Sequence, residues 1–191
     1  MNLSSMKLVI LDRDGTINED SADYIKHPDE WLPLPGALQA IARLNHAGWH
    51  VVVASNQSGL GRGLFDVSTL NAMHAKMHKL LAAVGGRVDA VFYCPHGPEE
   101  ACRCRKPEPG LFEQIGERYG IDLRHVPVVG DTARDVVAGV AVGCEPHLVF
   151  TGKGAAFKGR NLPDTFPPGT RTHDDLAAFA EFLIQRETAG A

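Results

Sequence analysis

The chain alternates short apolar runs with longer stretches in which apolar residues recur every three or four positions. Short apolar runs bounded by turn residues are typical of buried strands, and the longer spacing is typical of amphipathic helices. The apolar runs predict strands over residues 7–12, 49–55, 88–93, 126–131 and 147–150. The helical spacing predicts helices over residues 35–48, 66–85, 111–120 and 134–142, and a last one that begins at Asp174 or Asp175.

Strand and helix alternate in this order, and most of the predicted strands are apolar at successive positions. Both features indicate a parallel sheet that helices cover on its two faces, so we predict an α/β fold. Residues 153–171 are rich in glycine and proline and are predicted to form a loop. The chain shows no internal repeat or linker, and we therefore expect residues 1–191 to form one domain.

Polar residues follow the predicted strands at the points where these strands end. The first strand leads into DRDGT, with Asp12 and Asp14, and the fourth leads into GDTARD, with Asp131. In open parallel sheets ligands bind beyond the carboxyl ends of the strands, so these carboxylates are expected to converge. Carboxylates that close together repel one another unless a cation neutralises them, and Mg²⁺ prefers oxygen ligands. The sequence therefore predicts a magnesium site.

The same strand ends offer groups suited to phosphoryl transfer. Asp12 can attack phosphorus, and Asp14 can protonate the leaving oxygen and then deprotonate a water molecule. Ser55 follows the second strand and Lys106 follows the third, and both can hold a transferring phosphoryl group. Taken singly, each residue is more often a turn, cap or surface residue; their order at successive strand ends favours catalysis. Asp135 is left open between a supporting role and a salt bridge.

A cysteine-rich loop precedes the lysine. It offers three thiolates and an imidazole, a set that suits a structural tetrahedral zinc site, from Cys94, His96, Cys102 and Cys104. A disulfide would leave one cysteine unpaired, and a redox role is disfavoured because no C-x-x-C is present. A zinc ion here is expected to close the loop over 94–104 and to brace Arg105 and Lys106. Cys144 is predicted to be a small buried thiol.

These motifs resemble those of the haloacid dehalogenase (HAD) superfamily of phosphatases, with DRDGT, Ser55, Lys106 and GDTARD in the places of its motifs. The resemblance implies a Rossmann-like core, Asp12 as the nucleophile and Asp14 as the general acid and base. It also implies Mg²⁺ on Asp12, on Asp131 and on the backbone carbonyl of Asp14. The chain leaves little room for the separate cap domain that many members carry, and we expect none.

Within the superfamily the chain resembles the D-glycero-D-manno-heptose 1,7-bisphosphate phosphatases. DRDGTIN, SNQSG, TGKG and the loop CPH…C-x-C-R-K-P carry this resemblance. It implies removal of the C7 phosphate in the synthesis of nucleotide-activated heptose for lipopolysaccharide. Histidinol-phosphate phosphatases share the zinc loop and remain the alternative. The implied substrate contacts are Asp20, Tyr24, Ser55, Asn56, Gln57, Ser58, Arg105, Lys106 and Thr132.

Charge and hydropathy narrow the partners. The net charge of the 191 residues is −4, which gives no basic field for nucleic acid. No apolar run approaches the roughly 20 residues of a membrane span, and the N-terminus lacks the apolar region of a signal peptide. We therefore expect a cytoplasmic protein that binds neither nucleic acid nor a membrane. The resemblance implies a small phosphorylated sugar as its substrate, and a monomer is expected because no uncovered apolar stripe demands a partner. A non-catalytic zinc protein is the alternative from another functional class, and the acidic net charge and the strand-end aspartates disfavour it.

Six histidines are interpreted as surface or packing residues: His27, His46, His74, His78, His125 and His173.

Overall fold

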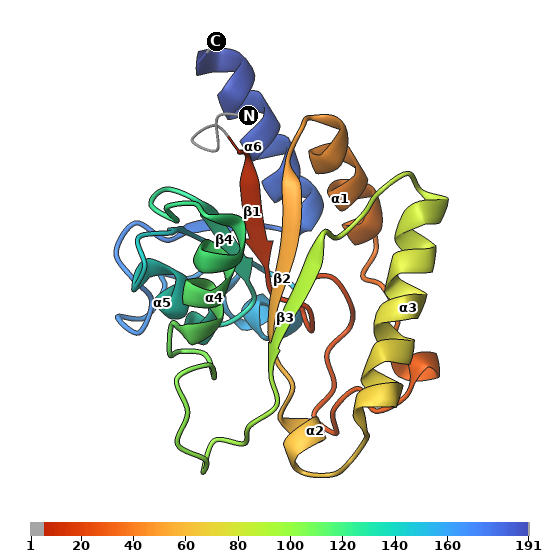
Figure 1. Cartoon of the computed structure of the whole chain (residues 1–191). Helices are drawn as coiled ribbons and strands as arrows, with labels where there is room; N and C mark the ends of the chain where they lie inside the picture. The colour runs from red at the N-terminus through yellow and green to blue at the C-terminus, as the bar shows by residue number, and fades with distance from the viewer. Residues whose placement is uncertain (1–5, 191) are drawn as a thin grey trace.

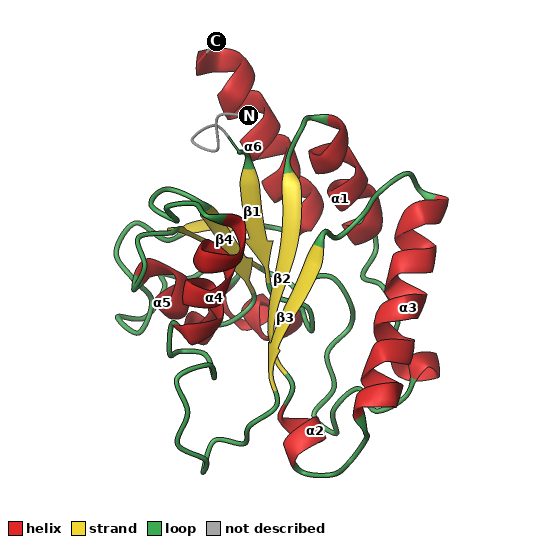
Figure 2. Ribbon diagram, viewed as in Figure 1, coloured by secondary structure: helices red, strands yellow, loops and turns green. Residues whose placement is uncertain are grey.

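The computed structural model describes residues 6–190 and is built on one six-stranded sheet in the order β3-β2-β1-β4-β5-β6 (Figures 1 and 2). Every neighbouring pair is parallel, as the apolar runs predict. The strands are β1 (Leu8–Leu11), β2 (His50–Asn56), β3 (Ala90–Cys94), β4 (Pro127–Gly130), β5 (Glu145–Val149) and β6 (Arg171–His173).

Helices cover both faces of the sheet, which explains why the central strands are apolar at successive positions. The helices are α1 (Ala37–His46), α2 (Ser58–Gly61), α3 (Val67–Ala83), α4 (Gly110–Tyr119), α5 (Ala133–Val140) and α6 (Leu176–Gly190). Val9 and Leu11 of β1 pack with residues of α1, α3 and α6, whereas Leu8 and Ile10 pack with residues of α4 and α5. Figure 1 shows α1 and α3 on one side of the sheet and α4 and α5 on the other. The predicted α/β fold is confirmed.

The helix ends follow local chemistry. The Asp66 carboxylate accepts a hydrogen bond of 2.7 Å from the backbone N–H of Thr69 and so caps α3. Gly120 ends α4 in the left-handed conformation, with φ at 63°.

The prediction of a loop over residues 153–171 is wrong at both of its ends. A 3₁₀ helix (η3, Gly152–Phe157) occupies its start, and the edge strand β6 occupies its end. These elements, like the four-residue α2, are too short to show a periodic pattern. In residues 6–190 we see no separate cap domain, and no helix there is both long enough and apolar enough to cross a bilayer.

Candidate active site

Three carboxylates meet where β1 and β4 end, because these strands are neighbours in the sheet. The side chains of Asp12, Asp131 and Asp135 each place an oxygen within 4.8 Å of the others. Burial first, and then the neighbouring carboxylates, raise the pKa of Asp12 to about 7 and that of Asp131 to about 8. A hard divalent cation would relieve this repulsion, and an all-oxygen set is the donor chemistry that Mg²⁺ requires.

The backbone closes around Asp131 from two sides. Gly15 and Gly152 both have positive φ, and a β-carbon at either position would collide with the Asp131 carboxylate. The backbone N–H of Lys153 donates to the same carboxylate at 2.8 Å, and the Thr151 hydroxyl donates to the Gly15 carbonyl at 2.6 Å. The loop after β5 therefore helps to fix this carboxylate in place.

Lys106 is the cation at the centre of the cluster. Its Nζ lies 2.8 Å from Asp12 Oδ1 and 2.7 Å from Asp135 Oδ1, and it donates to the Ala54 carbonyl at 2.6 Å. Burial acts against its charge, but the carboxylates of Asp12 and Asp135 outweigh this effect and raise the pKa of Lys106. The ammonium group therefore stays protonated beside Asp12, where a phosphoryl group would arrive.

The backbone of Lys106 is held by the side chain of Asn56, at the end of β2. The Asn56 Nδ2 donates to the Lys106 carbonyl, and the Lys106 N–H donates to Asn56 Oδ1, each at 3.0 Å. Asp135 supports the same lysine from α5: its second oxygen accepts hydrogen bonds from the Thr132 N–H and hydroxyl at 3.0 and 2.8 Å. Asp135 therefore fills both roles that the sequence leaves open: it supports the site by capping α5, and it forms a salt bridge with Lys106.

The carboxylate of Asp14 lines the same cavity as Asp12 but has partners of its own. Asn18 Nδ2 donates to Oδ1 at 2.8 Å, and Gln57 Nε2 donates to Oδ2 at 3.0 Å. Gln57 Nε2 also donates to the hydroxyl of Ser55 at 2.8 Å. Ser55 is completely buried, whereas the residues that follow it, Asn56, Gln57 and Ser58, line the cavity. The Asp14 carboxylate is therefore oriented by amide donors on two separate loops.

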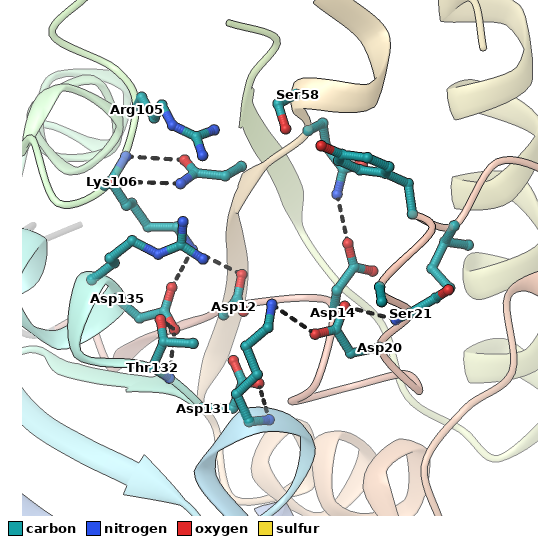
Figure 3. A pocket seen from close by; sticks show the side chains of 17 residues that line it. Asp12, Asp14, Asp20, Ser21, Ser58, Arg105, Lys106, Asp131, Thr132 and Asp135 are labelled. Atoms are coloured by element: carbon teal, nitrogen blue, oxygen red, sulfur yellow. Dashed lines mark hydrogen bonds and ion pairs between the residues drawn. The ribbon is translucent and has the colours of Figure 1, made fainter. Parts of the chain in front are cut away.

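A cavity of about 340 Å³ opens over these groups (Figure 3). Asp12 and Lys106 form its floor. Its wall carries most of the predicted substrate contacts, namely Asp20, Tyr24, Asn56, Gln57, Ser58, Arg105 and Thr132. In Figure 3 the labelled Asp14 and Asp20 lie on one side of Asp12, and Asp135 and Lys106 lie on the other. The volume suits a small molecule, and the charged lining suits a polar one.

The cysteine-rich loop forms a compact cluster. Cys94, His96, Cys102 and Cys104 each offer a donor atom within 4.8 Å of the others, and all the cysteines are free thiols. Contacts between donor atoms run from 3.0 Å, between Cys94 and Cys104, to 3.8 Å, between Cys94 and Cys102. Thiolates on a tetrahedral zinc ion lie about 3.8 Å apart, given a Zn–S distance of about 2.3 Å. The donor set therefore fits zinc, and so does the separation of the Cys94 and Cys102 sulfurs, whereas the Cys94 and Cys104 sulfurs lie closer together than two ligands of one tetrahedral ion.

The sequence is similar to those of known phosphatases. Residues 103–178 match the HAD-hydrolase-like family model. The chain is 57% identical to the D-glycero-beta-D-manno-heptose-1,7-bisphosphate 7-phosphatase of Bordetella bronchiseptica over 94% of its length and 99% of that protein. It is 54% identical to the enzyme of the same name from Pseudomonas aeruginosa, over 95% of this chain and 99% of the other. The chain belongs to the D-glycero-D-manno-heptose-1,7-bisphosphate 7-phosphatase family of the HAD superfamily.

A solved structure supports this assignment to the heptose bisphosphate phosphatase family. The crystal structure of the B. bronchiseptica D,D-heptose 1,7-bisphosphate phosphatase, complexed with magnesium and phosphate, superposes with a TM-score of 0.90. The match covers 95% of this chain and 99% of that one at 57% identity. The resemblance inferred from the motifs is therefore confirmed.

Some residues of the site were missed in the sequence. Arg134 and Lys153 line the cavity, and Lys153 Nζ lies 2.9 Å from Asp20 Oδ2. Lys153 belongs to the TGKG segment, which directly follows a strand. The rule that ligands bind beyond the carboxyl ends of parallel strands therefore applies to it as well. Arg13 and His74 carried no such signal. Arg13 is completely buried beside Asp14, and His74 is buried against it from α3.

Proposed function

We propose that this protein is a Mg²⁺-dependent phosphatase that removes the C7 phosphate of D-glycero-D-manno-heptose 1,7-bisphosphate and leaves the C1 phosphate in place. The observation that carries the proposal is the environment of Asp12. Its carboxylate lies on the cavity floor, 2.8 Å from the Lys106 ammonium and within reach of two further carboxylates. Membership of the heptose bisphosphate phosphatase family supports the substrate.

The residues of the cavity can carry a double displacement. Asp12 attacks the C7 phosphorus, and the bond from phosphorus to the sugar oxygen breaks as Asp14 gives its proton to that oxygen. Asp14 then takes a proton from a water molecule, which attacks the phosphorus of the aspartyl-phosphate; the bond from phosphorus to the Asp12 oxygen breaks, which frees the Asp12 carboxylate and releases inorganic phosphate. Lys106 holds the transferring phosphoryl group throughout, and Ser55 and Gln57 support the wall beside it.

Two metals belong to the proposal. Mg²⁺ would be held by Asp12, Asp131 and the backbone carbonyl of Asp14. When bound, it supplies positive charge that offsets the carboxylates and the incoming phosphate. Zinc would be held by the cluster at Cys94 and would have no open position for chemistry, because its ligands complete a tetrahedron.

The zinc cluster is expected to act as a brace. The Cys94 carbonyl accepts from the N–H of Gln57 at 2.8 Å, and the Pro95 carbonyl accepts from the N–H of Gly61 at 3.0 Å. Arg105 Nη1 donates to the His96 carbonyl at 3.2 Å. The loop therefore connects the segment after β2 to Arg105 and Lys106, and a closed metal site would hold both sides of the cavity at a fixed separation.

Phosphate release tests the proposal directly. D-glycero-β-D-manno-heptose 1,7-bisphosphate and histidinol phosphate are compared side by side, with Mg²⁺ and with a chelator. We expect Mg²⁺-dependent release, a strong preference for the heptose, and no activity in Asp12→Asn. A preference for histidinol phosphate would overturn the substrate and keep the chemistry. Full activity in Asp12→Asn would overturn the chemistry itself.

A further inference from the structure

The Arg13 side chain is buried completely although it follows the floor residue of the cavity in sequence. Its guanidinium grips the Asp14 carboxylate with two hydrogen bonds, from Nε to Oδ1 at 2.9 Å and from Nη2 to Oδ2 at 3.1 Å. Fork-to-fork pairs of this kind fix both distance and orientation. A buried guanidinium is stable only when its remaining N–H groups also find acceptors.

The second partner of Arg13 is His74, in the middle of α3. Arg13 Nη1 lies 3.1 Å from His74 Nε2, and His74 is only 8% exposed. Burial first, and then the Arg13 charge, lower the pKa of His74 to about 4, so the ring is neutral near pH 7. A guanidinium has only donors, so Nε2 must accept this hydrogen bond and the ring proton must lie on Nδ1.

We propose that His74 is a positioning residue for the reaction: it holds the Arg13 guanidinium and, through it, sets the orientation of the Asp14 carboxyl toward the leaving oxygen. The inference rests on the proposed function, because that function makes Asp14 the proton donor. Asn18 and Gln57 also hold the Asp14 carboxyl. Loss of His74 is therefore expected to tilt the Arg13–Asp14 pair without releasing it.

The chemistry of the leaving group distinguishes positioning from a structural role. When the leaving oxygen belongs to a sugar, it departs as a strongly basic alkoxide unless Asp14 delivers its proton as the bond to phosphorus breaks. When the leaving group is p-nitrophenolate, the nitrophenyl ring delocalises the negative charge left on the oxygen, and no proton is needed. A misdirected Asp14 therefore slows phosphoryl transfer from sugar phosphates and leaves phosphoryl transfer from p-nitrophenyl phosphate nearly unchanged.

The experiment measures kcat/KM for D-glycero-β-D-manno-heptose 1,7-bisphosphate, a series of alkyl phosphates and p-nitrophenyl phosphate, at saturating Mg²⁺. The variants are His74→Leu, which removes the acceptor, and His74→Gln, which keeps an oxygen acceptor. His78→Leu, at an exposed position one turn further along α3, is the matched control. His74→Leu is expected to lose about 10- to 100-fold on the sugar and alkyl phosphates and less than about threefold on p-nitrophenyl phosphate. His74→Gln and His78→Leu are expected to stay near the parent protein.

The alternative outcomes point to different conclusions. An equal loss on all substrates, or no loss, in a folded His74→Leu protein overturns the positioning role. If that variant does not fold, His74→Met and His74→Gln supply the same comparison, and equal activity of the two on the alkyl phosphates overturns it. Asp14→Asn separates this result from the proposed function. If Asp14→Asn loses far more kcat/KM on the alkyl phosphates than on p-nitrophenyl phosphate but His74→Leu does not, only the inference about His74 is refuted. If Asp14→Asn loses the same on both kinds of substrate, the role of Asp14 as the proton donor is refuted first.

Discussion

Asn56→Asp tests how the lysine is held, because the substitution preserves the shape of the side chain, replaces its N–H donor by an acceptor and adds a negative charge. Asn56 makes two hydrogen bonds of 3.0 Å to the Lys106 backbone, one as donor and one as acceptor. In the aspartate variant an oxygen replaces Nδ2 and faces the Lys106 carbonyl. One hydrogen bond is lost and two acceptors oppose each other, so the backbone of Lys106 must move.

The expected magnitude follows from these two contacts. A hydrogen bond contributes about 1 kcal/mol, and a partly buried carbonyl left without a donor costs about 1–2 kcal/mol more. If this loss of about 2–3 kcal/mol raises the activation free energy in full, because the Lys106 ammonium is misplaced at the transition state, kcat/KM falls roughly 30- to 150-fold. Asn56→Ala removes both hydrogen bonds without the opposition and leaves space for water, so we expect a smaller loss of about 10-fold.

The assay is steady-state phosphate release with kcat and KM measured separately at saturating Mg²⁺. Positioning of Lys106 predicts that the loss appears mainly in kcat. The sequence-based prediction that Asn56 contacts substrate places the loss in KM instead, because a contact made equally in the ground state changes binding alone. A kcat for Asn56→Asp within twofold of the parent protein refutes the positioning account.

Three further predictions concern the charges and metals. Lys106→Met leaves Asp12 without its cation and is expected to lower kcat by about 10²- to 10³-fold, measured at saturating Mg²⁺; a loss under tenfold contradicts its role. Cys104→Ser is expected to lose zinc in elemental analysis and to lower the melting temperature, and unchanged zinc content argues against the cluster. Burial raises the pKa of Asp12 to about 7 and of Asp131 to about 8. The folded metal-free protein therefore binds protons that the unfolded chain has lost, and this stability, complete below about pH 4, fades as the pH rises to about 8. Stabilisation by Mg²⁺ in thermal unfolding should accordingly be greater at pH 8 than at pH 5.5, and the reverse trend would contradict it.

The parallel sheet and the carboxylates of the cavity could be predicted from the sequence because both follow from the burial of the strands. A strand buried on two faces must be apolar until it leaves the sheet, so the first polar residues mark its end. Parallel strands then bring those ends to one edge, where Asp12 and Asp131 meet. β6 escaped this reasoning because it has three residues and lies at the edge of the sheet, where burial no longer demands an apolar run.

The supporting contacts could not be read in the same way. His74 and Arg13 are 61 positions apart, and a polar residue within an amphipathic helix gives no sign that its ring meets a buried guanidinium. Asn56 lies 50 positions before Lys106 and bonds to its backbone, which every residue type has. Such contacts depend on how the elements pack, and local sequence carries little information about packing between distant segments.

The nucleophile at Asp12 is the central claim, and chemical trapping tests it most directly. The reaction of D-glycero-β-D-manno-heptose 1,7-bisphosphate with Mg²⁺ and excess protein is quenched in acid within the first turnover. Borohydride then reduces any aspartyl-phosphate to homoserine, and peptide mass spectrometry locates the change. The account predicts homoserine at position 12 and at no other aspartate, and none in Asp12→Asn. A completed turnover with residue 12 unmodified at every time point, or a modification at another residue, would contradict it.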